Sequence, residues 1–140
     1  MSRTLAREVA MKLAFSRLLG GEGDYAQLLR LSGVKQKANE SDEAFATFLL
    51  NGIETNREQI DVLITEFSSG WKLDRIAKVD LCILRIAIYE LLYCDDIPQS
   101  VSINEAVEIA KTFGGDKSSS YINGVLGGLT RKLSENSEKA

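Results

Sequence analysis

Residues 79–93, VDLCILRIAIYELLY, constrain the fold more than any other stretch, because a helix built from them is apolar on nearly every side. A helix that is hydrophobic all round is buried among other elements. Arg85 and Glu90 interrupt the run, and a buried charge needs a partner. Pro98 follows and blocks continuation of the helix. The stretch therefore predicts a central helix in which Arg85 and Glu90, if buried, are paired.

The rest of the chain carries helical patterns and no period-2 strand pattern. A first helix is expected to end at Gly20, and a last helix over about residues 118–133 is followed by a polar tail, 134–140, that is expected to fray. Further helices are expected over residues 24–33, 41–51, 55–70 and 102–113. We therefore expect an all-α fold of about seven helices in a single domain, residues 1–140.

Several classes of protein are disfavoured by what the sequence lacks. Histidine is absent, which removes the commonest general base and most zinc sites. Cys82 and Cys94 lie in or next to an apolar run and are expected to be buried free thiols. There is no Gly-rich phosphate loop, so we expect no enzyme, no cofactor and no metal site. No apolar stretch reaches the ~18 residues of a spanning helix, and no signal peptide is evident, so we expect a cytoplasmic protein without membrane contact.

Charge is distributed unevenly, although the net charge is only -3. Residues 1–17 carry four basic side chains and one acid, whereas residues 38–70 carry seven acids and one arginine. This polarity favours an anion at one end of the molecule and a basic partner elsewhere. Solvated faces without a binding role explain the same clusters equally well.

The segment 102–115, SINEAVEIAKTFGG, concentrates polar side chains that helix geometry explains without catalysis. Ser102 and Glu105 have the spacing of a capping box, in which each side chain bonds the backbone N–H of the other residue. We therefore expect a helix to start at Ser102. Asn104 is left without a predicted role.

Three blocks resemble the NusB family of bacterial transcription antitermination factors: GWKLDRIAKVDLCILRIAIYEL (70–91), IPQSVSINEAVEIAKTFG (97–114) and YINGVLGGL (121–129). They occur in the order and spacing of that family, and together with AREVAMKLAF (6–15) they cover most of the chain. The resemblance implies two packed helical bundles and no enzymatic activity. It also implies binding of a single-stranded boxA-type RNA together with a small-subunit ribosomal protein (NusE), in a complex that acts with RNA polymerase on ribosomal RNA genes.

RNA binding, as the resemblance implies it, directs attention to the basic first helix and to the start of the last helix. Basic side chains neutralise phosphates, and free N–H groups at a helix start favour an anion. The expected RNA contacts are Arg3, Arg7, Lys12, Lys117, Ser118, Ser119, Ser120 and Tyr121. N-capping explains the serines equally well, and core packing is the alternative for Tyr121, so both interpretations stay open.

For the protein partner, the resemblance points to Phe15, Arg17 and Asp80. Phe15 lies on a second apolar stripe of the first helix, which would serve a homodimer as well as a ribosomal protein. An acid at the start of the central helix suits a basic partner. Many family members have consecutive arginines before the first helix, where SRTLAR keeps only Arg3 and Arg7. The alternative function is therefore a helical scaffold or homodimer with weak or lost RNA binding.

Overall fold

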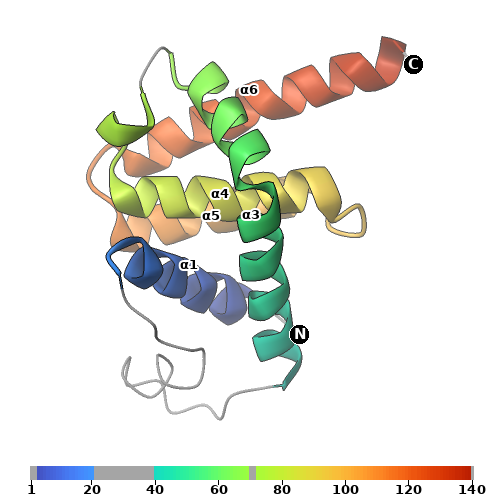
Figure 1. The fold of residues 1–140 in the computed structure, drawn as a ribbon. Helices are drawn as coiled ribbons and strands as arrows, with labels where there is room; N and C mark the ends of the chain where they lie inside the picture. Colours follow the sequence, from blue (N-terminus) through green and yellow to red (C-terminus); the bar gives the residue numbers. More distant parts are fainter. Residues whose placement is uncertain (1–2, 21–39, 70–71, 140) are drawn as a thin grey trace.

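The computed structural model describes residues 3–20, 40–69 and 72–139. All regular structure in these ranges is helical, which confirms the all-α prediction (Figure 1). The elements are α1 (Thr4–Leu18), α3 (Glu40–Phe67), the 3-10 turn η1 (Leu73–Arg75), α4 (Lys78–Tyr93), α5 (Gln99–Phe113) and α6 (Ser118–Lys139). The described ranges hold five α-helices, fewer than the seven expected, and one reason is that the two helices expected over 41–51 and 55–70 form a single helix, α3. The helix expected over 24–33 lies outside the described residues.

A kink in α3 replaces the predicted break between two helices. Asn56 leaves helical geometry, with φ -114° and ψ 16°. Its Nδ2 donates a hydrogen bond to the Gly52 carbonyl oxygen at 2.8 Å, so the side chain competes with the backbone ladder. The Tyr93 hydroxyl of α4 lies 3.2 Å from Asn56 Oδ1 and donates to Gln59 Oε1 at 2.6 Å. The kink is thus held by a local side-chain bond and by contact with α4.

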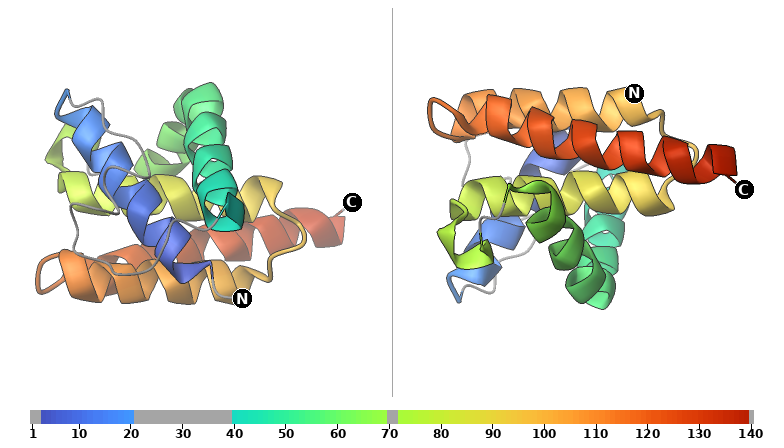
Figure 2. Two further views of the ribbon diagram at one scale, coloured as in Figure 1. Left: turned by 90° about the horizontal axis from the view of Figure 1, so that it is seen from below. Right: turned by 90° about the horizontal axis from the view of Figure 1, so that it is seen from above.

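Helix α4 lies in the middle of the molecule, and α1, α3, α5 and α6 all pack against it (Figures 1 and 2). Ten of its 16 residues are buried, which is more than one face of a helix can supply. Leu84 and Ile88 are fully enclosed. The predicted central helix is confirmed, and its all-round hydrophobicity is explained by neighbours on several sides.

Arg85 and Glu90, the two charges that interrupt the apolar run of α4, both have partners, as the sequence predicts. Glu90 is 1% exposed and accepts hydrogen bonds from Arg7 Nε at 2.9 Å, Arg7 Nη2 at 2.8 Å and Ser102 Oγ at 3.0 Å. Arg85 donates to both carboxylate oxygens of Asp61 in α3, each at 2.9 Å. Glu90 therefore ties α4 to α1 and α5, and Arg85 ties it to α3.

Helix α5 begins at Gln99 rather than at the predicted Ser102. Pro98 stands directly before the first turn, where its missing N–H costs nothing. Ser102 donates its hydroxyl to Glu90, and Glu105 accepts a hydrogen bond from Thr4 Oγ1 at 2.9 Å. The predicted capping box is wrong, because both side chains bond to other helices instead of to their own backbone.

Helix α6 extends to Lys139, past the predicted end near residue 133. Its C-terminal end projects beyond the other helices (Figure 2). Gly124, Gly127 and Gly128 lie inside this helix, and only Gly128 of the three approaches a neighbour closely, the ring of Phe67.

The two cysteines are buried free thiols, as predicted. Burial raises the pKa of Cys82 to about 11, although Arg85 opposes the shift. Burial and the nearby Glu90 and Asp96 raise the pKa of Cys94 to about 11. Neither thiol is ionised near neutral pH, so neither is a reactive nucleophile. Among the described helices, none combines the length and apolarity needed to cross a membrane.

Replacing Arg7 with alanine should lower the free energy of unfolding by about 3–5 kcal/mol, because Glu90 is left charged and unpaired in the core. Urea unfolding followed by circular dichroism measures the change. Lys111→Ala is the control: its 3.3 Å pair with Glu108 is exposed, and its loss should cost about 0.5 kcal/mol or less. Equal losses for the two variants would show that the buried pair does not stabilise the fold.

Gly52→Ala should also destabilise the protein, because a Cβ at Gly52 would overlap the ring of Tyr89. Overpacking of this kind costs about 1–3 kcal/mol. Gly124→Ala in α6 is the matched change, since open space surrounds that position. It should leave stability unchanged or raise it by up to about 1 kcal/mol, because alanine favours a helix interior over glycine. Thermal unfolding of the two variants measures the difference in stability. If Gly52→Ala is as stable as the unmodified protein, Gly52 is not closely packed against Tyr89.

Candidate nucleic-acid interface

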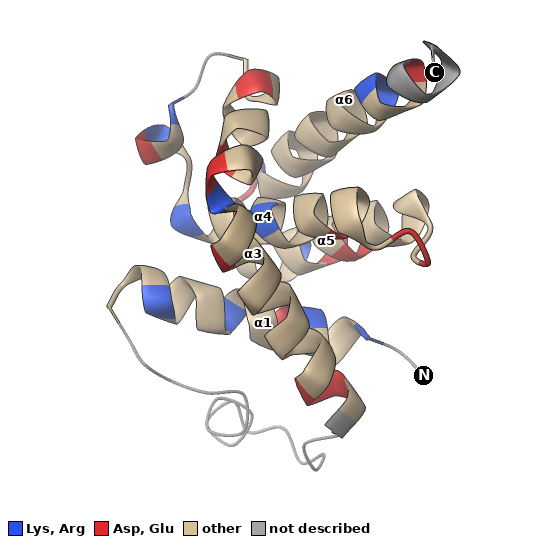
Figure 3. Ribbon diagram, turned by 45° about the vertical axis from the view of Figure 1, so that its right-hand side comes forward, with Lys and Arg blue, Asp and Glu red and all other residues tan. Residues whose placement is uncertain are grey.

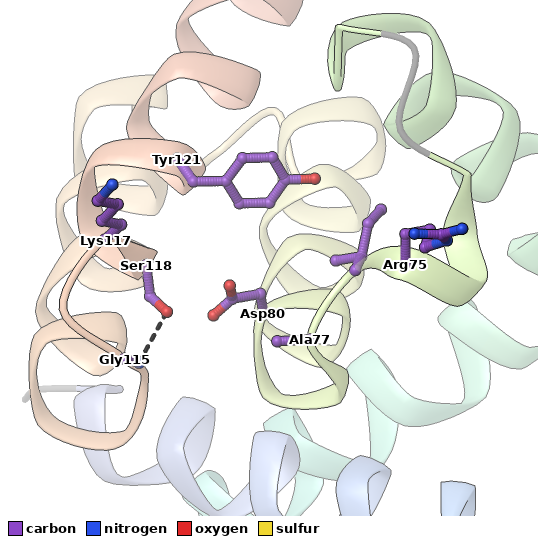
Figure 4. Close-up of a pocket in the computed structure, with 8 residues that line it drawn as sticks. Arg75, Ala77, Asp80, Gly115, Lys117, Ser118 and Tyr121 are labelled. Carbon is purple, nitrogen blue, oxygen red and sulfur yellow. Dashed lines mark hydrogen bonds between the residues drawn. The ribbon is translucent and has the colours of Figure 1, made fainter.

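A pocket of about 420 Å³ opens between the start of α4 and the start of α6, and we call it the α4–α6 pocket (Figure 4). Its walls come from η1 and the residues after it, from the first turn of α4, and from the turn between α5 and α6. It is lined by Arg75, Ile76, Ala77, Asp80, Gly115, Lys117, Ser118 and Tyr121. The pocket therefore joins Lys117, Ser118 and Tyr121, predicted for RNA, with Asp80, predicted for a protein partner.

Asp80 lies in the first turn of α4, and its carboxyl group points into the pocket (Figure 4). The residue is 7% exposed, and Oδ1 has no hydrogen-bond partner in the described part of the chain. The free N–H groups at a helix start favour negative charge, which helps to tolerate a carboxylate there. The unpartnered Oδ1 is itself buried, with almost no accessible surface.

Ser118 holds the turn between α5 and α6. Its Oγ accepts a hydrogen bond from the Gly115 N–H at 2.9 Å, and its own N–H donates to the Gly115 carbonyl at 3.1 Å. A Cβ at Gly114 would meet Ser118 Cβ and Oγ at 2.5 Å, so the turn requires glycine there. Ser118 is buried, and its hydroxyl accepts from the Gly115 N–H in the turn before α6, which is not an N-cap bond. Ser119 is half-buried and Ser120 is exposed.

Tyr121 contributes its ring to the pocket and ties its hydroxyl to Ser68 near the end of α3. Ser68 Oγ donates its one proton to the Ile64 carbonyl at 2.5 Å, so the Tyr121 hydroxyl is the donor in the 2.7 Å bond between the two. Burial raises the pKa of Tyr121, the bond to Ser68 opposes the shift, and the charge of Asp80 adds to it. The hydroxyl stays protonated and internally bonded, which leaves the ring face for a ligand.

The arginines predicted to contact RNA from α1 do not lie at the pocket. Arg3 is exposed and stacks on the ring of Phe45, with its guanidinium carbon 4.2 Å from the ring centroid. Arg7 is 4% exposed and bonded to Glu90. The predicted contact of Arg7 with RNA is therefore wrong, because a buried guanidinium that is paired with Glu90 is not accessible to a phosphate.

Lys12 lies at the same end of the molecule as the pocket, because α1 runs parallel to α5. Thr4 at the start of α1 bonds to Glu105 in the middle of α5. Lys12 Nζ lies 4.8 Å from the ring centroid of Phe113, the last residue of α5. The turn that lines the pocket follows directly, which makes Lys12 the basic side chain of α1 best placed to extend the site.

The residues predicted for a protein partner on α1 lie at its C-terminal end. Phe15 is half-buried and packs against the core. Its contact with a ribosomal protein, or with a second copy in a homodimer, stays a prediction. Arg17 is exposed in the last turn. Leu18 and Leu19 follow with exposed fractions of 36% and 59%. This end of α1 therefore presents apolar surface beside a cation.

Arg75 is the pocket residue that sequence reasoning missed. It lies in η1 and is exposed, on the opposite side of the pocket from Lys117 (Figure 4). Figure 3 shows basic positions along α1 and around η1. The signal in the sequence was the recurrence of Lys72, Arg75 and Lys78 shortly before Asp80, in a segment interpreted only as a turn.

Comparison with known proteins decides the family. The sequence matches the NusB family over residues 4–131. It is 44% identical over 131 residues to the transcription antitermination protein NusB of Acetivibrio thermocellus, covering 94% of this chain and 90% of that protein. It is 43% identical over 143 residues to the NusB of Natranaerobius thermophilus, covering 96% and 99%. The chain belongs to the NusB family.

Solved structures support the NusB fold. NusB of T. maritima superposes with a TM-score of 0.80 at 33% identity, covering 94% of this chain and 92% of that one. A chain from a complex of the antitermination factors NusB and NusE with dsRNA gives a TM-score of 0.79 at 22% identity, covering 93% and 96%. The second likeness shows the shared fold, and the NusB-like all-α prediction is confirmed.

In this NusB-family chain, Tyr121→Phe should lower the free energy of unfolding by about 1 kcal/mol, because the buried Ser68 hydroxyl loses its donor. Tyr93→Phe is the control, since its hydroxyl is bonded at an exposed position where water replaces the partner. Its loss should be smaller, about 0.5 kcal/mol. Urea unfolding measures the free energy of unfolding of both variants. If Tyr121→Phe is as stable as the unmodified protein, the bond from the Tyr121 hydroxyl to Ser68 does not hold the ring in place.

Proposed function

We propose that this chain is a transcription antitermination factor that binds a single-stranded boxA-type RNA together with the small-subunit ribosomal protein NusE and supports processive ribosomal RNA transcription. The observation that carries the RNA part is the α4–α6 pocket, whose lining includes Arg75, Lys117 and Tyr121. The relatives are named transcription antitermination proteins, and a chain of this fold occurs in a complex of NusB and NusE with dsRNA. These partners belong to the cytoplasm, next to RNA polymerase.

The pocket suits a single strand for physical reasons. Single-stranded RNA is held by cations that follow its phosphates and by rings on which its bases stack. Lys117 and Arg75 supply cations on opposite sides, and Lys12 extends the basic surface past Phe113. Ser119 and Ser120 stand in the first turn of α6, where free N–H groups favour a phosphate.

We assign the ribosomal-protein contact to the C-terminal end of α1 and to Asp80 at the start of α4, the acid that suits a basic partner. Phe15 and the exposed Leu18 and Leu19 form apolar surface at that end of α1, next to Arg17. The acidic surface of α3 is less suited to a basic partner, because three of its acids, Glu54 among them, already pair with cations of this chain. Asp61 bonds Arg85 at 2.9 Å, and Glu66 accepts from Lys132 at 2.8 Å.

A scaffold or homodimer with weakened RNA binding is the second candidate. The burial of Arg7 and the stacking of Arg3 on Phe45 favour it, because both withdraw cations from a strand at the pocket. The same end of α1 would then form the contact between two copies. Light scattering at two protein concentrations tests this alternative through the mass in solution.

The primary test is the affinity for a boxA-like RNA and for a scrambled RNA of equal length, each with and without NusE, by fluorescence anisotropy. We expect tighter binding of the boxA-like RNA, a further gain when NusE is added, and weaker binding as salt rises. Equal affinity for the two RNAs in both conditions would refute RNA recognition. Binding of NusE without any RNA would favour the scaffold.

Lys117→Ala should weaken RNA binding and lower the slope of log affinity against log salt by about 0.7, the value for one single-strand phosphate contact. Arg57→Ala is the matched control, because Arg57 is exposed, pairs with Glu54 at 3.4 Å and lies outside the pocket. It should leave the slope unchanged. The same slope for both variants would place the phosphate contacts elsewhere.

A further inference from the structure

Another pocket opens at the C-terminal end of α4, away from the α4–α6 pocket at its start, and we call it the aromatic pocket. It has a volume of about 400 Å³ and lies between the start of α3, the end of α4 and the residue before α1. Its lining includes Arg3, Phe45, Phe48, Tyr93 and Asp96. The RNA and NusE contacts proposed above leave the aromatic rings at this end of the molecule unused.

Four aromatic rings form a row from α3 to α4, and three of them line the aromatic pocket. The distance between ring centroids is 6.3 Å from Phe45 to Phe48, 5.5 Å from Phe48 to Tyr89 and 5.0 Å from Tyr89 to Tyr93. Phe48 is 45% exposed and Tyr93 is 42% exposed, although burial of such rings is favourable. The Tyr93 hydroxyl donates to Gln59 Oε1 at 2.6 Å, which holds its ring. A ligand therefore meets rings that are already in place, which lowers the cost of ordering them.

The chain itself shows which kind of side chain these rings accept. The guanidinium carbon of Arg3 lies 4.2 Å from the centroid of the Phe45 ring, and that of Arg7 lies 5.4 Å from it. A guanidinium over a ring is attracted by the negative face of the ring. No cation of the described residues lies over Phe48 or Tyr93. Two exposed rings of the row are therefore left for a cation from outside.

The charges around the aromatic pocket favour such a cation. Asp95 and Asp96 follow α4, both are exposed, and neither forms an ion pair with a described residue. Glu43 is a further exposed acid, next to the lining residue Ala44. Figure 3 shows acids both in the turn after α4 and at the start of α3. Against these three acids stands Arg3, which is already engaged with a ring, so the surface attracts a base and repels a phosphate.

We propose that the aromatic pocket is a docking site for an arginine side chain of a basic protein partner. The guanidinium lies against Phe48 and Tyr93 and donates to the carboxylate of Asp96. Arginine suits this site better than lysine, because its planar guanidinium stacks on rings and binds a carboxylate through two N–H groups. An apolar side chain would use the rings but leave the carboxylate without a partner. The contact lies at the opposite end of α4 from the α4–α6 pocket and does not depend on the proposed RNA binding.

The test titrates the intact, isotope-labelled protein with short capped peptides and follows its NMR spectrum. The peptides differ only in the central residue, which is arginine, lysine, leucine or citrulline, a residue with the shape of arginine and no charge. We expect saturable shifts around Phe48 and Tyr93 with the arginine peptide, weaker binding of the lysine peptide and no saturation with the other two. Binding of the arginine peptide should weaken as salt rises. Equal affinity for the arginine peptide and for the citrulline or leucine peptide would overturn the proposal.

Two substitutions locate the contact. Phe48→Leu and Asp96→Asn should each weaken binding of the arginine peptide about two- to fivefold, as the loss of an exposed cation–π contact or surface ion pair does. Val62→Ala and Asp74→Asn are the matched controls, because they change an exposed apolar residue and an exposed acid outside the pocket. Both controls should leave the affinity unchanged, and thermal melts confirm that all four variants are folded. Unchanged affinity in Phe48→Leu and Asp96→Asn would show that the arginine binds elsewhere.

A second copy of this chain is the other occupant that the experiment separates from a partner. Arg17 stands beside the exposed Leu18 and Leu19 at the end of α1, so a second copy also carries an arginine on an apolar surface. If the mass from light scattering rises with protein concentration and Phe48→Leu abolishes that rise, the pocket holds a second copy and the proposal is overturned. Equal binding of boxA-like and scrambled RNA would refute RNA recognition and leave this inference standing, because the peptide titrations contain no RNA.

Discussion

The buried ion pair between Arg7 and Glu90 is the interaction on which the arrangement of the helices depends. A carboxylate that is 1% exposed in the central helix is tolerated only when donors surround it, and here they come from α1 and α5. Hydrophobic packing alone tolerates sliding of one helix along another. Two hydrogen bonds from one guanidinium and a third from Ser102 do not, so the pair determines how α1 and α5 align on α4.

The alignment set by this pair has consequences for the binding surface. Because α1 runs parallel to α5, Lys12 lies beside Phe113 at the end where the α4–α6 pocket opens. Arg7 is removed from the surface by the same interaction, and Arg3 is left at the opposite end of α1 on the ring of Phe45. In the basic N-terminal segment, Arg7 therefore stabilises the fold, whereas Lys12 contributes charge near the pocket. The other cations near the pocket, Arg75 and Lys117, come from η1 and the α5–α6 turn.

The pocket combines groups that favour an anion with one that opposes it. Arg75, Lys117 and the N-terminus of α6 carry charge or partial charge that favours an anion, whereas the buried Asp80 carries the opposite charge. Such a mixture suits selective binding more than tight binding, since an unpaired polar group penalises every ligand that fails to match it.

The sequence by itself determined the helical class, the central position of residues 79–93, the need for partners at Arg85 and Glu90, and the family. These follow from periodicity and from the cost of burying charge, which depend on nearby residues. The partners themselves were decided by tertiary structure. Arg7 resembled a surface cation in the sequence, but the packing of α1 on α4 pairs it with Glu90. Ser102 and Glu105 resembled a cap, but they bond to α4 and α1 instead. Tyr121 likewise lies far in sequence from Arg75 and Asp80, and only the packing of α4 against α6 made the three part of one pocket. A local pattern records which groups need partners, whereas the choice among distant partners depends on helix packing.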